Sequence, residues 1–166
     1  MREMLLTHKK YLYIPESIRT LTPSSIEIEK LSLHFCSKAR LTLTDQDWPN
    51  LQYLEIIGCQ YIEISFISQV ESKFTQFYIA HSKYVDFLDI TGNFPHLVKG
   101  TIDQCKYVKF KGEWKGNLQL NQLEFIGSRQ VDLFKQSASL PALERLDFQE
   151  GCHFLKLDLS QLSAPH

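Results

Sequence analysis

Apolar and polar residues alternate along two short runs between residues 54 and 64, LEIIGCQYIEI. Successive side chains of a strand point to opposite faces, so a period of two indicates strands that each bury one face. Gly58 and Cys59 separate the two runs and indicate a tight corner. The stretch therefore predicts a strand, a corner and a second strand.

This pattern recurs every 23 residues along most of the chain. Its units begin at Leu31, Leu54, Phe77, Gly100, Leu123 and, with one inserted residue, Leu146. A unit of this length cannot bury its own apolar face, so stacking on neighbouring units must supply the core. We therefore expect a repeat solenoid, α/β or mostly β, with about six coils whose parallel strands stack into a sheet.

The repeats also predict the domain organisation. We expect one domain over residues 1–166, with an N-terminal cap at 1–25, six repeats at 26–160 and a C-terminal tail at 161–166. Little sequence follows the last repeat, so either Leu159 and Leu162 close the core, or a second chain or a further segment does. A second chain there would give weak self-association through the C-terminal end.

Segments between units carry prolines at a spacing of two units. Pro49, Pro95 and Pro141 each follow a large apolar residue, and proline suits a turn or a first helical position because it cannot donate to a strand ladder. Residues 67–74 and 134–143 are expected to form a short helical turn or an irregular return.

Four cysteines occupy one column of the repeat, at the corner. The column consists of Cys36, Cys59, Ser82, Cys105, Ser128 and Cys152. Small, weakly polar residues suit a tight corner, whereas a zinc site needs thiolates that converge from loops, typically as closely spaced pairs. Cys36 and Cys59 could approach disulfide range. We interpret the column as structural and reduced, with no metal and no cofactor.

The stretch from Leu51 to Ile62 resembles the leucine-rich repeat in its cysteine-bearing form, L-x-x-L-x-L-x-x-C-x-x-I. The resemblance covers about four-fifths of the chain. Gly100 departs from it in place of an expected leucine, and the second run is more strand-like than in most members. These departures leave open a β-solenoid with two strands per coil. The resemblance implies a protein-binding module that uses the sheet of first strands, and it implies no reaction.

By this resemblance the partner would contact the solvent-facing positions of the first strands. The expected site consists of Tyr53, Glu55, Ile57, Tyr78, Thr101, Asp103, Glu124, Ile126, Arg145 and Asp147. Two tyrosines and two isoleucines among them would form an exposed aromatic and apolar group of the kind found at interface hot spots. Alternatively, the isoleucines are ordinary scattered surface residues.

A second column lies two residues after the corner. It contains Lys38, Tyr61, Tyr84, Tyr107, Gln130 and Phe154. The next position is always apolar, so we assign that position to the core and the tyrosines to the surface, where their rings would stack.

Composition narrows the partner and the compartment. With 43% apolar residues the chain can form a real core, and its net charge of −1 provides no basic field for nucleic acid or anionic lipid. The first residues lack the apolar region of a signal peptide, and no stretch approaches the roughly 18 apolar residues of a membrane span. We expect a cytoplasmic protein, although a specialised bacterial secretion route would leave no such mark.

An enzyme would need reactive groups gathered in one place. The repeat puts Glu124 beside Asp147 and Glu63 beside Asp86, about the carboxylate separation of retaining glycosidases, so a carbohydrate-active β-helix enzyme is the alternative. Arg145 would instead pair with Asp147 as an ordinary ladder charge, as Lys109 would with Asp132.

We therefore expect a non-catalytic module that binds a protein partner of unknown identity, with no nucleic acid and no membrane. A bacterial toxin-neutralising, immunity-like protein, an effector or an adaptor would fit this description.

Overall fold

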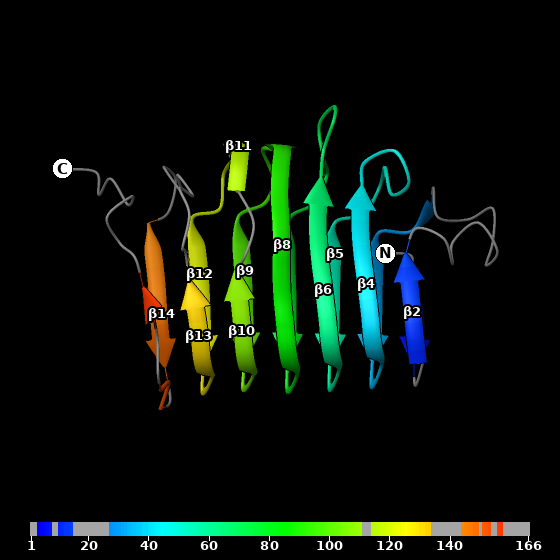
Figure 1. Ribbon diagram of the computed structural model, residues 1–166. Helices are drawn as coiled ribbons and strands as arrows, with labels where there is room; N and C mark the ends of the chain where they lie inside the picture. Colours follow the sequence, from blue (N-terminus) through cyan, green and yellow to red (C-terminus); the bar gives the residue numbers. More distant parts are fainter. Residues whose placement is uncertain are drawn as a thin grey trace.

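The structure is a computed structural model of two parallel β-sheets that face each other (Figure 1). It describes residues 3–7, 10–14, 27–110, 114–133, 144–149, 151–153 and 156–157. Each coil contributes one strand to each sheet, with one extra strand in the second sheet, and a tight corner joins the two strands. The prediction of a repeat solenoid with stacked parallel strands is confirmed.

The first sheet is built from the first strand of each coil. In spatial order its strands are β1 (Glu3–Thr7), β3 (Lys30–His34), β5 (Tyr53–Ile57), β7 (Gln76–Ala80), β9 (Lys99–Asp103), β12 (Gln122–Ile126) and β14 (Arg145–Gln149). Lys30 pairs with Tyr53, and the same one-period step continues across the sheet to Arg145. The repeat period of the sequence is therefore the register of the strand pairing.

The second sheet follows the same order. Its strands are β2 (Lys10–Ile14), β4 (Ser37–Thr44), β6 (Gln60–Ile67), β8 (Lys83–Phe94), β10 (Lys106–Phe110), β13 (Arg129–Leu133) and β15 (Lys156–Leu157), with β11 (Trp114–Leu118) paired to the far half of β8. The register shifts by one residue between β6 and β8, after Ile64. The segment expected as a cap contributes β1 and β2, which extend both sheets by one coil.

The core lies between the sheets, where inward-facing side chains of both layers meet. Leu54 and Ile56 of the first sheet and Ile62 and Ile64 of the second are fully buried, as alternating strands require. Gly100 occupies the inward column, and a Cβ there would overlap the ring of Phe77 on the neighbouring strand. The phenylalanine thus fills the volume that the resemblance assigned to a leucine.

The return segments of the described residues are irregular and contain no α-helix. Pro49 and Pro95 follow the first residue of a turn, in which Leu51 N donates to Trp48 O at 3.2 Å and Leu97 N to Phe94 O at 3.3 Å. Residues 68–75 form an irregular return, so of the two expectations for 67–74 the irregular one is correct. Residues 134–143, Phe154 and 158–166 lie outside the described residues.

Candidate functional site

Hydrogen bonds join the corners of successive coils. We call the six corner residues the corner ladder: Cys36, Cys59, Ser82, Cys105, Ser128 and Cys152. The backbone N–H of Cys36 donates to Cys59 Sγ at 3.3 Å, and that of Cys59 donates to Ser82 Oγ at 3.0 Å. Cys105 N–H donates to Ser128 Oγ at 3.1 Å. The corner side chains of Cys59, Ser82 and Ser128 therefore each accept a hydrogen bond from a buried amide of the preceding coil.

The corner thiols are free and lie in contact with backbone carbonyls. Cys59 Sγ lies 3.4 Å from the carbonyl oxygens of Leu33 and Ile57. Burial raises the pKa of the Cys59 thiol and of the Cys105 thiol to about 12. A protonated thiol is a weaker nucleophile and metal ligand than a thiolate, and at Cys59 the sulfur accepts the Cys36 amide hydrogen bond.

The first sheet gathers the expected partner-binding residues on its outer face. Tyr53, Glu55 and Ile57 lie on β5, Tyr78 on β7, Thr101 and Asp103 on β9, Glu124 and Ile126 on β12, and Arg145 and Asp147 on β14. All ten alternate with core residues, and successive strands place them side by side. The structure thus brings the set together on one surface.

This surface is less exposed than the sequence suggested. Tyr53, Tyr78, Ile57 and Ile126 are half-buried, and Thr101 is only 7% exposed. Neighbouring strands lie so close that long side chains cover short ones, and Thr101 Oγ1 donates to Glu124 Oε2 at 3.2 Å. The expected exposed group is therefore a packed face with partly accessible rings.

A charged network crosses one half of this face. Lys30 Nζ lies 3.2 Å from Glu3 Oε1 and 3.3 Å from Glu55 Oε2, and Glu55 Oε1 lies 2.9 Å from His34 Nε2. Hydrogen bonds from Ser32 and Lys30 lower the pKa of Glu3. Desolvation opposes the charge on Lys30, but both carboxylates outweigh it and raise the Lys30 pKa. These charges hold one another in fixed positions.

A shallow hollow of about 320 Å³ opens on the other half of the face. Its lining residues are Tyr53, Gln76, Phe77, Tyr78, Lys99, Thr101 and Glu124, and we call it the sheet hollow. Tyr78 Oη donates to Asp103 Oδ2 at 3.0 Å, and Lys99 Nζ lies 2.9 Å from Glu124 Oε2. Gln76 and Lys99 were not among the expected site residues, although they share a repeat column with Tyr53.

No family model, curated protein or solved structure matches the chain. Function must therefore be inferred from the surface of the solenoid itself. Within the described ranges, no helix is long and apolar enough to cross a membrane. Nor do those ranges hold a group of three or more His, Cys, Asp or Glu side chains arranged to bind a metal ion.

The neighbouring carboxylates lie among cations. Glu124 is in register with Asp147, and Lys99 contacts the first while Arg145 contacts the second. Burial tends to raise the pKa of Glu124, but Lys99, together with the Thr101 hydrogen bond and the charge of Arg145, outweighs burial and lowers it. A lowered pKa favours the ionised form of Glu124, which accepts hydrogen bonds from Thr101 and Gln122.

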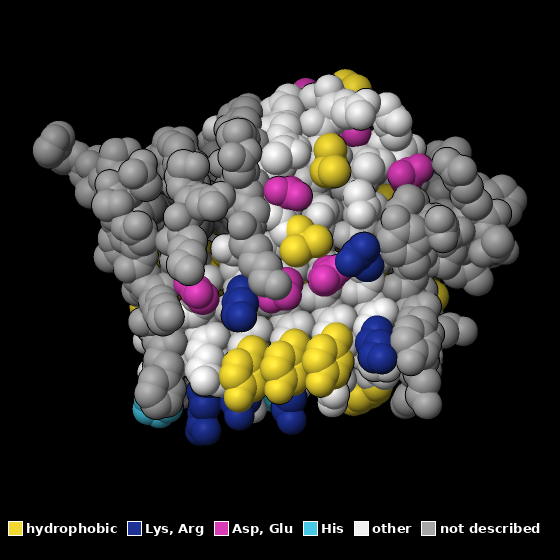
Figure 2. Space-filling view, in the orientation of Figure 1, with side chains coloured by type: hydrophobic (Ala, Val, Ile, Leu, Met, Phe, Trp, Pro, Cys, Tyr) yellow, Lys and Arg dark blue, Asp and Glu magenta, His cyan; other side chains and the backbone are white. Residues whose placement is uncertain are grey.

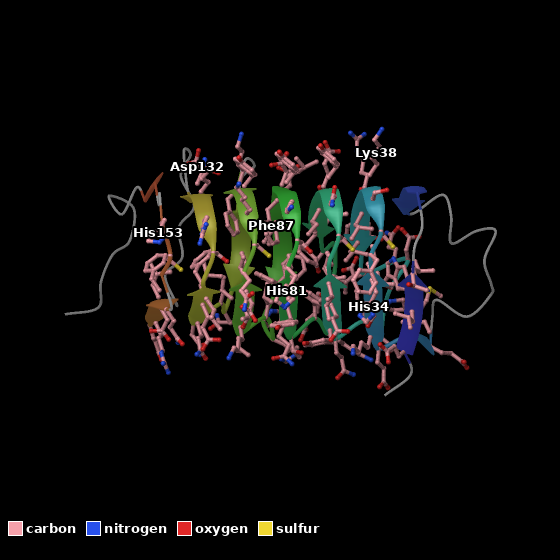
Figure 3. All side chains as sticks on the ribbon, turned by 90° about the horizontal axis from the view of Figure 1, so that it is seen from below. His34, Lys38, His81, Phe87, Asp132 and His153 are labelled. Atoms are coloured by element: carbon pink, nitrogen blue, oxygen red, sulfur yellow. The ribbon has the colours of Figure 1, made fainter. Side chains whose placement is uncertain are left out.

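Charges on the outer side of the second sheet form a similar ladder. Glu63 is in register with Asp86, and Arg40 forms an ion pair with Glu63. Lys109 is in register with Asp86 on one side and with Asp132 on the other. Figure 3 shows Asp132 projecting from this outer side, while Phe87 lies between the sheets. Lys109 and Asp132 are thus neighbours on adjacent strands, as the sequence predicted.

The tyrosine column lies at the surface, as predicted. We call Tyr61, Tyr84 and Tyr107 the tyrosine strip; neighbouring rings are stacked, with centroids 4.7 Å apart and planes within 2° of parallel. Tyr61 is 52% exposed, whereas Val85, one residue after Tyr84, is fully buried. The strip follows the corners and is separate from the sheet hollow.

Proposed function

We propose that this protein is a non-catalytic binding module whose first-sheet face holds a protein partner over the sheet hollow. The observation that carries the proposal is the hollow, because it places two tyrosine rings, a short Thr101 and the charged pair Lys99–Glu124 around one depression. Tyrosine is enriched at interface hot spots, where it contributes a large contact area at low entropic cost.

The shape and charge of the hollow favour a side chain of a protein over a small molecule. A small ligand is usually buried over most of its surface, and this hollow is shallow. Glu55, Asp103 and Glu124 make the surroundings rich in carboxylates, and aromatic rings line the depression. Arginine can stack on an aromatic ring while its guanidinium pairs with a carboxylate, so we propose an arginine of the partner as the anchor.

Within this class, we propose a bacterial toxin-neutralising protein, an effector or an adaptor as the biological role. Neutralisation by coverage needs a rigid surface and no chemistry, and a sheet fixed by coil-to-coil hydrogen bonds supplies such a surface. A leucine-rich-repeat protein would use its first strands in the same way.

A carbohydrate-active enzyme is less well supported. Its two carboxylates would need different protonation states, with one pKa raised so that it can donate a proton. Glu124 has a lowered pKa and contacts Lys99, and Asp147 contacts Arg145. The Glu124→Gln, Asp147→Asn variant would test this alternative, because an enzyme of this kind would lose activity on its polysaccharide.

Affinity capture with matched variants tests the proposed binding face. Tyr53→Ala with Tyr78→Ala removes two rings from the sheet hollow, and Tyr61→Asn with Tyr84→Asn removes two rings from the tyrosine strip. We expect the first variant to lose about 100-fold or more in affinity for the partner retained by the wild type, since hot-spot side chains contribute about 2 kcal/mol or more each. The second variant should bind like the wild type.

Circular dichroism establishes that both variants are folded. An equal loss of affinity for the partner in both variants would contradict the assignment of the binding site to the first-sheet face. Retention in both would contradict it as well.

A further inference from the structure

Charge is segregated at five successive corners of the solenoid, whereas the sequence of the sixth unit has Glu150 before its corner cysteine. We call the surface along these corners the corner edge. In each coil it consists of the two residues between the strands and the first two residues of the second strand, at positions 35–38, 58–61, 81–84, 104–107 and 127–130. These positions contain Lys38, Lys83, Lys106 and Arg129 and no Asp or Glu. Dark-blue side chains accordingly lie along the lower edge of Figure 2, beneath a row of three yellow ones. The net charge of −1 conceals this local cationic edge.

The corner edge also exposes aromatic surface. Phe35 is 57% exposed and Tyr84 is 40% exposed, and with Tyr61 they supply three of the six large apolar side chains that are exposed in the described residues. Lys106 Nζ lies 4.9 Å from the centroid of the Tyr107 ring. Cations and amphipathic rings therefore lie in two adjacent columns of one narrow strip.

The backbone holds this edge in a straight row. All five described residues of the tyrosine column have a positive φ between 56° and 60°: Lys38, Tyr61, Tyr84, Tyr107 and Gln130. The Lys83 N–H donates to Cys59 O at 2.9 Å and the Lys106 N–H to Ser82 O at 3.0 Å. The spacing of the rings thus follows the spacing of the coils.

Two polymeric ligand classes fit this edge poorly. A peptide that adds as a β-strand needs unpaired backbone groups, but the amides of Gly58, Lys83 and Lys106 already donate to neighbouring coils. Single-stranded nucleic acid needs open ring faces on which bases can stack, but the faces of Tyr84 are covered by Tyr61 and Tyr107. Tyr61 and Tyr84 remain exposed at their ring edges, and the cations Lys83, Lys106 and Arg129 are exposed as well.

We propose that the corner edge docks on an anionic lipid surface. A planar surface of negative headgroups needs neither a groove nor free backbone groups. Lysine and arginine are attracted to it, and tyrosine favours the boundary between headgroups and acyl chains. Lys83, Lys106 and Arg129 contact the headgroups, and the tyrosine strip enters the interfacial layer. The corner edge joins the two sheets at one end of their strands (Figure 1). The sheet hollow lies on the outer face of the first sheet, so it stays free for a partner.

Vesicle sedimentation with matched charge variants tests this proposal. The probes are vesicles of phosphatidylcholine with phosphatidylserine and vesicles of phosphatidylcholine alone. Lys83→Gln, Lys106→Gln and Arg129→Gln remove three cations from the corner edge. Arg40→Gln, Lys73→Gln and Lys109→Gln remove three cations elsewhere and change the net charge equally.

We expect the wild type to bind only the vesicles with phosphatidylserine, and less so as salt rises. The corner-edge variant should partition about 100-fold less, since each cation near the surface contributes about fivefold. The control variant should bind nearly as well as the wild type. Tyr61→Asn, Tyr84→Asn and Tyr107→Asn, which keep a residue that tolerates positive φ, should also reduce binding.

Equal losses in the two charge variants would overturn the proposal, because net charge rather than the edge would then govern binding. Absence of wild-type binding to the anionic vesicles would overturn it too. Tight binding of a single-stranded oligonucleotide by a wild type that ignores the vesicles would assign the edge to nucleic acid instead.

Discussion

At the scale of single residues, each corner depends on one small hydrogen-bonding side chain. Ser82 accepts a hydrogen bond from the Cys59 amide and donates one to Ala80 O at 2.9 Å, and all of these groups are buried. Four of the six corner positions hold cysteine in place of serine. A thiol and a hydroxyl therefore act as alternatives for one structural task.

Ser82→Ala should destabilise the fold by about 1 to 3 kcal/mol, because it leaves a buried amide without an acceptor. Ser82→Cys should cost less than about 1 kcal/mol, since a thiol at the neighbouring corner already accepts the equivalent amide bond. Urea denaturation of the three proteins measures both differences. Equal stability of Ser82→Ala and the wild type would show that the ladder contributes nothing.

At the scale of strands, the inward-facing column of the first sheet shows how a residue other than leucine can occupy a leucine position of the repeat. Phe77 on β7 occupies space beside Gly100 on β9, and Leu123 on β12 approaches the same position from the other side. The sequence reveals each departure from leucine separately. That the large Phe77 compensates for the small Gly100 could not be predicted from the pattern, because it depends on how far the Phe77 ring extends toward the neighbouring strand.

Exchanging this pair for the common residue of the column tests the compensation. Gly100→Leu alone should destabilise the fold by about 1 to 3 kcal/mol, because the new side chain overlaps the Phe77 ring. Phe77→Leu with Gly100→Leu should be more stable than the sum of the single changes predicts, by at least about 1 kcal/mol. A double-mutant cycle in urea measures the coupling, and additive effects would contradict it.

The strand pairing also shows which parts of the fold and of the candidate site the sequence predicts. The six repeats can be predicted because their period equals the register of the strand pairing, as in the pairing of Lys30 with Tyr53. The coil of β1 and β2 does not follow from the repeat period, because Glu3 pairs with Lys30 at a longer separation. The outer face was located by alternation, whereas burial of Thr101 and the contribution of Lys99 depend on side chains of neighbouring strands.

At the scale of the whole molecule, each coil is stabilised only by its neighbours, as in other repeat proteins. The inward side chains of the middle coils are fully buried, with Leu54 and Ile56 on β5 as examples. The corresponding Leu146 and Phe148 on β14 are only half-buried. The described coils are thus unequal in the apolar area they bury, even though their backbone register is the same.

This inequality predicts a gradient of protection in hydrogen exchange. Amides of β6 and β8, which lie between complete coils, should exchange slowest, and those of β14 should exchange fastest, because local opening costs least where least apolar area is buried. Mass spectrometry of peptic fragments after exchange in deuterated water measures the gradient. Uniform protection from β3 to β14 would contradict it and would show that the coils open only together. A partner or vesicle that bound at β14 would slow exchange there and reduce the difference in exchange rate between β14 and the middle strands. Exchange measured with and without each ligand therefore also locates its contacts along the solenoid.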